Sequence, residues 1–184
     1  MRMIYKNPQV LEALLDRVTA FLIEFGRALI ENGANVIFLP EPTASAAMIS
    51  PAAFRQFVLP RLQTITAKLD VPCILHICGD TSPVLDSIGQ TGADVLSLDQ
   101  CMNLAESRST LPGAVLGGNV DPINSLLHGN REQIAEDTLN CLRAAGTRRV
   151  ILMSGCGVPP GTPVEKVAAM VKTAKAYGMG PGES

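Results

Sequence analysis

The feature that most constrains the fold is a regular alternation of short apolar runs with longer amphipathic segments. The runs predict strands at 35–40, 72–78, 94–98, 114–120 and 149–153. The segments predict helices at 8–31, 51–69, 82–90, 104–110, 131–145 and 163–177. Short apolar strands that are each followed by a helix indicate an α/β protein with a parallel sheet.

Several helix boundaries carry recognisable end signals. The first helix is expected to end at Asn32-Gly33, because glycine readily takes the backbone conformation that closes a helix. Ser50 suits the N-cap of the second helix and Pro51 suits its first turn. These signals fix the order of the elements along the chain.

Polar residues stand at or just after the carboxyl end of every predicted strand. In chain order they are Glu41, His76, Cys78, Asp99, Asn119, Asp121 and Cys156. The carboxyl ends of parallel strands lie at one edge of the sheet, where sites form in such folds. The sequence therefore predicts one functional site built from all five strand ends.

A histidine and two cysteines in this set form a candidate zinc site. Alternation along a strand places His76 and Cys78 on the same face, and Cys156 follows the fifth strand. One imidazole and two thiolates supply three zinc ligands and leave a fourth position open, as in catalytic zinc sites. The alternative is that these cysteines are small buried apolar residues, which is the interpretation we favour for Cys73, Cys101 and Cys141.

Four further residues are predicted to shape a substrate pocket. Ser97 and Asp99 share one face of the third strand, and Asn119 and Asp121 share one face of the fourth. A carboxylate that orients the ring of His76 is also expected, with Asp99 and Asp121 as candidates. The alternative for Asp99, Asn119 and Asp121 is a cap at a strand-to-helix turn.

Composition excludes some classes of function. The net charge is -2 and the sequence has no block of basic residues, so nucleic-acid binding has no electrostatic support. No uninterrupted apolar stretch reaches the roughly 18 residues of a membrane span. An odd number of cysteines, five, without a signal peptide predicts a reducing, cytoplasmic location.

The length of 184 residues suits a single domain, 1–184, with a flexible tail at 178–184. A complete (β/α)8 barrel usually needs about 250 residues. About five βα units are therefore either a doubly wound sheet or most of a barrel. A partial barrel would leave parallel edges unpaired, which predicts a homo-oligomer or a missing N-terminal half.

Several motifs resemble one known family. They are LPEPTAS at 39–45, ISP at 49–51, FVLP at 57–60, HICG at 76–79, GNVDP at 118–122 and GCGVPPGTP at 155–163. In this order they resemble the C-terminal part of the uroporphyrinogen decarboxylase superfamily. The resemblance implies a TIM-barrel type (β/α)8 fold, of which this chain has about five βα units.

The His-x-Cys pair with Cys156 is similar to the zinc-dependent cobalamin methyltransferase branch of that superfamily, whereas the decarboxylases proper typically carry a histidine at the position of Cys156. The resemblance implies zinc as cofactor, a methyl-cobalamin donor on a corrinoid protein, and a small thiol such as coenzyme M as acceptor. Some relatives use tetrahydrofolate as the acceptor instead. It also offers Glu41 as a fourth ligand without substrate; a hydrogen bond in the turn before Pro42 is the alternative. Competing functions are a uroporphyrinogen decarboxylase-like enzyme and a non-catalytic subunit that binds a corrinoid protein.

Overall fold

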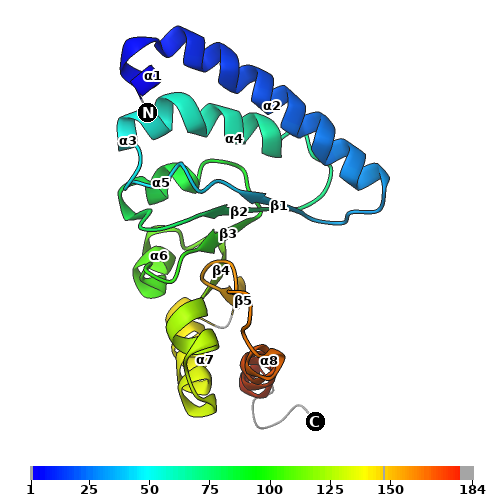
Figure 1. Ribbon diagram of the computed structural model, residues 1–184, viewed down its shortest axis with the longest axis vertical. Coiled ribbons are helices and arrows are strands. Elements are labelled where there is room, and N and C mark those ends of the chain that lie inside the picture. The colour runs from blue at the N-terminus through cyan, green and yellow to red at the C-terminus, as the bar shows by residue number, and fades with distance from the viewer. Residues whose placement is uncertain (1, 147, 179–184) are drawn as a thin grey trace. The chain divides into compact units, whose positions relative to one another are not determined.

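The computed structural model describes residues 2–146 and 148–178, which divide into two compact units, one up to Leu96 and one from Ser97 onward. In the first unit β1 pairs with β2, and in the second unit β4 pairs with β5; both pairs are parallel and are drawn in Figure 1. The strands are β1 (Ile37–Pro40), β2 (Cys73–Ile77), β3 (Val95–Leu98), β4 (Val115–Val120) and β5 (Val150–Ser154). The division falls within β3, which contributes residues to both units.

The first unit packs helices against the parallel pair β1 and β2. The register runs from Ile37 opposite Cys73 to Pro40 opposite His76. Its helical elements are α1 (Arg2–Lys6), α2 (Pro8–Glu31), α3 (Pro51–Ala53), the π-helical turn η1 (Phe54–Val58), α4 (Leu59–Thr66), the 3-10 turn η2 (Ser82–Val84) and α5 (Leu85–Ile88). Figure 1 shows α2 and α4 on the same side of this strand pair.

Apolar side chains from α2, α4 and the two strands form the core of the first unit. Its buried members are Ile23, Ile37, Ile65, Leu69 and Cys73. Cys73 is 1% exposed, which confirms its interpretation as a buried apolar residue. Burial, and then the neighbouring Asp94 carboxylate, raise the pKa of the Cys73 thiol. Burial therefore keeps this cysteine in its neutral form.

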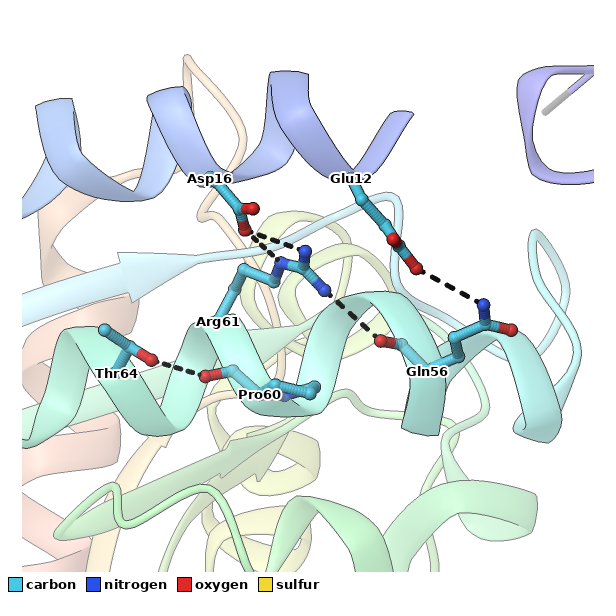
Figure 2. A network of polar contacts seen from close by, with 6 residues as sticks. All are labelled: Glu12, Asp16, Gln56, Pro60, Arg61 and Thr64. Carbon is cyan, nitrogen blue, oxygen red and sulfur yellow. Dashed lines mark hydrogen bonds and ion pairs between the residues drawn. The ribbon is translucent and has the colours of Figure 1, made fainter. Parts of the chain in front are cut away.

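Polar contacts tie α2 to the segment that contains η1 and α4 (Figure 2). The Arg61 guanidinium donates to Asp16 Oδ1 from Nη2 at 2.7 Å and from Nε at 3.0 Å. Glu12 lies one helical turn before Asp16 in α2, and its Oε1 accepts from Gln56 Nε2 at 3.4 Å. The Asp16 side chain is largely exposed, so this ion pair contributes little to stability, at most about 1 kcal/mol.

The second unit pairs β4 with β5, from Leu116 opposite Val150 to Val120 opposite Ser154. Its helical elements are α6 (Leu104–Thr110), the π-helical segment η3 (Pro122–Leu127), α7 (Arg131–Ala145) and α8 (Val164–Gly178). One core cluster buries Val120, Leu126, Ile134 and Met170. Through this cluster, α7, η3 and α8 pack against the end of β4.

The structure departs from the predicted helices at η1 and at η3. The helix expected at 51–69 is interrupted by η1 and ends at Thr66. Pro60 explains the disturbance, because it has no N–H for the carbonyl of Gln56, which instead accepts from Arg61 Nη1 at 3.3 Å. The segment η3 has no counterpart among the predicted helices, because Pro122 and the short run after it show no helical periodicity.

The predicted tail at 178–184 lies outside the described residues, apart from Gly178 at the end of α8. Within residues 2–146 and 148–178, no helix is both long enough and apolar enough to cross a membrane. Cys101 is exposed, so the expectation that it is a buried apolar residue is wrong. It lies in the turn after β3, where its backbone N–H binds Asp99.

Candidate functional site

The carboxyl end of β2 brings the predicted histidine and cysteine together in the first unit. His76 is the fourth residue of β2 and Cys78 follows the last, so strand alternation places both side chains on one face. His76 is 5% exposed and Cys78 is half-buried. His76 Nε2 and Cys78 Sγ lie 3.5 Å apart.

This separation suits two ligands of one zinc ion. Zinc binds imidazole nitrogen at about 2.0–2.1 Å and thiolate sulfur at about 2.3 Å in tetrahedral geometry, which places the two ligand atoms about 3.6 Å apart. The observed Nε2–Sγ distance of 3.5 Å agrees with that value. The pair can therefore bind a tetrahedral metal with little movement of either side chain.

The backbone under His76 is fixed by the neighbouring strand. The Glu41 N–H donates to the His76 carbonyl at 2.8 Å, which extends the β1–β2 pairing past the end of β1. Glu41 Oε1 accepts from the Thr43 N–H at 3.2 Å and from the Thr43 hydroxyl at 2.5 Å. The carboxylate of Glu41 thus takes part in a local turn, as the alternative to metal binding predicts.

Cys156 lies in the second unit, two residues after β5. The Gly155 N–H donates to the Val120 carbonyl at 2.8 Å, and the Ser154 hydroxyl donates to the Cys156 carbonyl at 2.7 Å. These bonds fix the backbone on both sides of the thiol, which is half-buried. The prediction that Cys156 shares one site with His76 and Cys78 stays a prediction.

Asn119 connects β4 to the turn that follows β3. Its amide nitrogen donates to the Asp99 carbonyl at 2.9 Å and to the Met102 carbonyl at 2.8 Å, and its Oδ1 accepts from Cys141 Sγ at 3.5 Å. Asp99 Oδ1 accepts from the Cys101 N–H at 3.1 Å. Asn119 and Asp99 therefore stabilise this turn, and a role in binding substrate stays a prediction for both.

Asp121 caps η3. Its Oδ1 accepts from the N–H groups of Ile123 and Asn124 at 2.7 and 2.8 Å, and its Oδ2 accepts from Asn124 Nδ2 at 2.7 Å. Burial alone would raise the pKa of the Asp121 carboxyl, but the bonds from Asn124 and Ile123 outweigh it and the pKa is lowered. This arrangement is the capping role that the sequence offered as the alternative to substrate binding. Ser97, the remaining predicted pocket residue, is buried in β3.

Sequence reasoning gave no role to Phe38, whose ring stacks on the imidazole of His76 in the first unit. Alternation along β1 does place Phe38 and Pro40 on one face of the strand. Only the register between β1 and β2 shows that this face continues into the face that carries His76. The contact therefore had no signal in the sequence that could be used without the fold.

Comparison with known proteins identifies the family. The profile of the uroporphyrinogen decarboxylase (URO-D) family matches residues 1–177. The chain belongs to this family. It is 32% identical over 177 residues to the methylcobamide:CoM methyltransferase MtbA of Methanosarcina acetivorans, and 33% identical over 179 residues to the uroporphyrinogen decarboxylase of a Synechococcus species. These alignments cover 95% and 94% of this chain, and 51% and 49% of the relatives.

A solved structure described as a methyltransferase from Methanosarcina mazei superposes with a TM-score of 0.91 at 33% identity. The superposition covers 96% of this chain and 52% of that one. The chain thus spans about half the length of the relatives that it matches. The predicted fold class is confirmed: the chain is an α/β protein that forms part of a (β/α)8 barrel.

Proposed function

We propose that this chain is part of a zinc-dependent methyltransferase that moves a methyl group from a methyl-corrinoid to a thiol such as coenzyme M. The observation that carries the proposal is the 3.5 Å separation of His76 Nε2 and Cys78 Sγ, which matches a pair of zinc ligands. The similarity to a methylcobamide:CoM methyltransferase supports the choice of donor and acceptor. The corrinoid is proposed to arrive on a separate protein.

The proposed ligands are His76, Cys78 and Cys156, the His/Cys group among the described residues whose chemistry could hold a metal ion. One imidazole and two thiolates suit zinc and leave one tetrahedral position for a further ligand. Glu41 is proposed as an occupant of that position without substrate, after release of its bond to Thr43. A reducing cytoplasm fits this proposal, because the thiols must stay reduced to bind a metal.

The protein must present the acceptor sulfur as a thiolate. A free thiol has a pKa of about 8.5, so most of it carries its proton at neutral pH and is a poor nucleophile. Bound zinc would supply the positive charge that keeps the acceptor sulfur deprotonated. The acceptor thiolate would then form the new S–C bond while the methyl–cobalt bond of the corrinoid substrate breaks, with the bonding electron pair left on the corrinoid.

The residues of the chain contribute orientation and shielding. His76 is buried, and its carbonyl accepts from the Glu41 N–H, so the backbone that carries the imidazole is fixed. Cys156 lies in a turn whose backbone is fixed by the hydrogen bonds of Gly155 and Ser154. Side chains on a fixed backbone lose less conformational entropy when they bind a metal.

The second candidate is a decarboxylase that acts on a porphyrinogen without a metal. The Synechococcus uroporphyrinogen decarboxylase matches this chain as closely in identity as the methyltransferase does, which keeps this candidate in view. The proximity of an imidazole and a thiol at the end of β2 favours the methyltransferase, because metal-free decarboxylation gives no role to that pair.

Metal content tests the proposal directly. We expect one zinc per purified chain by elemental analysis, and loss of most of it in Cys78→Ser and in Cys156→Ser. The matched control for zinc content is Cys141→Ser, because Cys141 lies half-buried in α7 and bonds to Asn119 rather than to a proposed zinc ligand. A folded wild-type chain without zinc would exclude the proposed site, and zinc retained in both ligand variants would show that it binds elsewhere.

Activity separates the two candidate reactions. The chain is incubated with methylcobalamin and coenzyme M, and the methylated thiol is measured by mass spectrometry; uroporphyrinogen is supplied in a parallel assay. Methylated thiol that disappears in Cys78→Ser supports the methyltransferase. Release of carbon dioxide from uroporphyrinogen, unchanged in Cys78→Ser, would support the decarboxylase instead.

A further inference from the structure

Phe38 is a large aromatic residue of β1 that does not belong to the core cluster of the first unit. Its neighbours Ile37 and Leu39 pack into the core with residues of α2 and α4. Phe38 lies on the opposite face of the strand and is 48% exposed. Its ring stacks on the imidazole of His76, with ring centroids 6.1 Å apart and ring planes inclined by 24°.

The two rings are carried by adjacent hydrogen-bonded strands rather than by loops. In the register of β1 and β2, Phe38 lies opposite Ile74 and Pro40 lies opposite His76. Residues opposite one another in parallel strands project from the same face, so Phe38 and His76 are diagonal neighbours. The Glu41 N–H bond to the His76 carbonyl keeps this register up to the end of the pair.

The contact between Phe38 and His76 restricts rotation of the His76 imidazole about its bond to Cβ, which sets the direction of Nε2. Rotation about the bond between Cβ and an aromatic ring has broad energy minima, so an isolated imidazole samples many ring planes. In the stacked arrangement seen here, attraction between the two rings favours imidazole planes close to parallel with the Phe38 ring. In the plane that is observed, Nε2 of His76 faces Cys78 Sγ at 3.5 Å.

We propose that Phe38 is a positioning residue: its ring holds the imidazole of His76 in the plane that directs Nε2 towards Cys78. The inference rests on the proposed function, in which these two atoms bind a metal. A ligand that already has its bound orientation loses less freedom on binding, so removal of the stack weakens metal affinity. Phe38 itself contacts neither the metal nor the substrate in this proposal.

The experiment compares metal binding by the wild-type chain, Phe38→Leu and Phe38→Tyr. Zinc dissociation constants are measured by competition with a chromophoric chelator, and visible spectra are recorded after replacement of zinc by Co²⁺. The matched control is Phe25→Leu, because Phe25 is also exposed, at 53%, and stacks on Phe21 in α2. Circular dichroism spectra establish that each variant is folded.

We expect Phe38→Leu to raise the zinc dissociation constant about fivefold, the amount that corresponds to loss of one aromatic pair. Its Co²⁺ spectrum should shift, because the imidazole no longer meets the metal in one fixed plane. Phe38→Tyr keeps the stack and should bind within about twofold of wild type. Phe25→Leu should match wild type in both measurements.

Two results would overturn the inference: wild-type affinity and spectrum in Phe38→Leu, or equal weakening in Phe38→Tyr and Phe38→Leu. If Phe38→Leu does not fold, Phe38→Met replaces it with the same expectations. Failure of the proposed function looks different, because the wild-type chain itself would then bind no zinc. A wild-type chain that binds zinc and a Phe38→Leu variant that binds it equally well would reject only the role of Phe38.

Discussion

Replacement of Arg108 should destabilise the second unit substantially, although this side chain is only half-buried. Its guanidinium donates to four backbone carbonyls: Nε to Ala145 at 3.0 Å, Nη1 to Ala114 at 2.7 Å and Leu111 at 3.5 Å, and Nη2 to Arg149 at 2.8 Å. One side chain of α6 thus joins the last residue of α7 to the residues that precede β4 and β5.

The magnitude follows from the three bonds of 3.0 Å or less. A hydrogen bond to a charged group contributes about 1.5–3 kcal/mol. Because Arg108 is half-buried, water can reach some of the carbonyls after the side chain is removed. Arg108→Ala should therefore lower the free energy of unfolding by about 2–4 kcal/mol. Arg108→Lys should recover about a third, because a single ammonium cannot span the carbonyls that the planar guanidinium reaches.

Urea denaturation followed by circular dichroism measures these differences. The control is Arg143→Ala, a change on the exposed face of α7 that should stay within about 0.5 kcal/mol of wild type. A loss below about 1 kcal/mol for Arg108→Ala would refute the reasoning. Wild-type stability in Arg108→Lys would refute it as well, because a positive charge without the guanidinium geometry would then stabilise the unit equally.

Three further changes test other parts of the structure by the same method. Asp121→Ala removes the cap of η3 and should cost about 1 kcal/mol at pH 7. The pKa of Asp121 is lowered by folding, so its contribution is present above the unfolded value of about 3.9 and is lost as the pH falls through the lower folded pKa; the difference between variant and wild type should therefore shrink at pH 3. Gly155→Ala should cost about 1–3 kcal/mol or more, because the added Cβ would lie 2.4 Å from Gln100 N, whereas Gly157→Ala, with open space around it, should be nearly neutral. Asp16→Ala removes the ion pair between α2 and α4 and should cost at most about 1 kcal/mol, a difference that should diminish in 1 M salt.

Local signals in the sequence were sufficient for most of the elements. The predicted helices at 104–110 and 131–145 coincide with α6 and α7, and both begin at an asparagine whose side chain accepts from the first turn. Such caps depend on residues a few positions apart, so they can be read without the fold. The interruption at η1 also has a local cause, because Pro60 lacks the N–H that a regular helix needs at this position.

The roles of the strand-end residues could not be separated in the same way. Asn119 and Asp121 both stand at the carboxyl end of β4, yet Asn119 bonds to the turn after β3 and Asp121 caps η3. A carboxylate or amide at a strand end is equally suited to a cap and to a pocket, and its partners determine which it becomes.

The sequence by itself determined the parallel α/β architecture, the family and the pairing of His76 with Cys78 on one strand face. These follow from hydrophobic periodicity, motif order and strand alternation, which act over short distances along the chain. The tertiary structure decided which polar residues are bound up in turns, and it placed the ring of Phe38 against His76. Those contacts depend on the register between strands, and register is set by packing of the whole sheet against its helices rather than by any local signal.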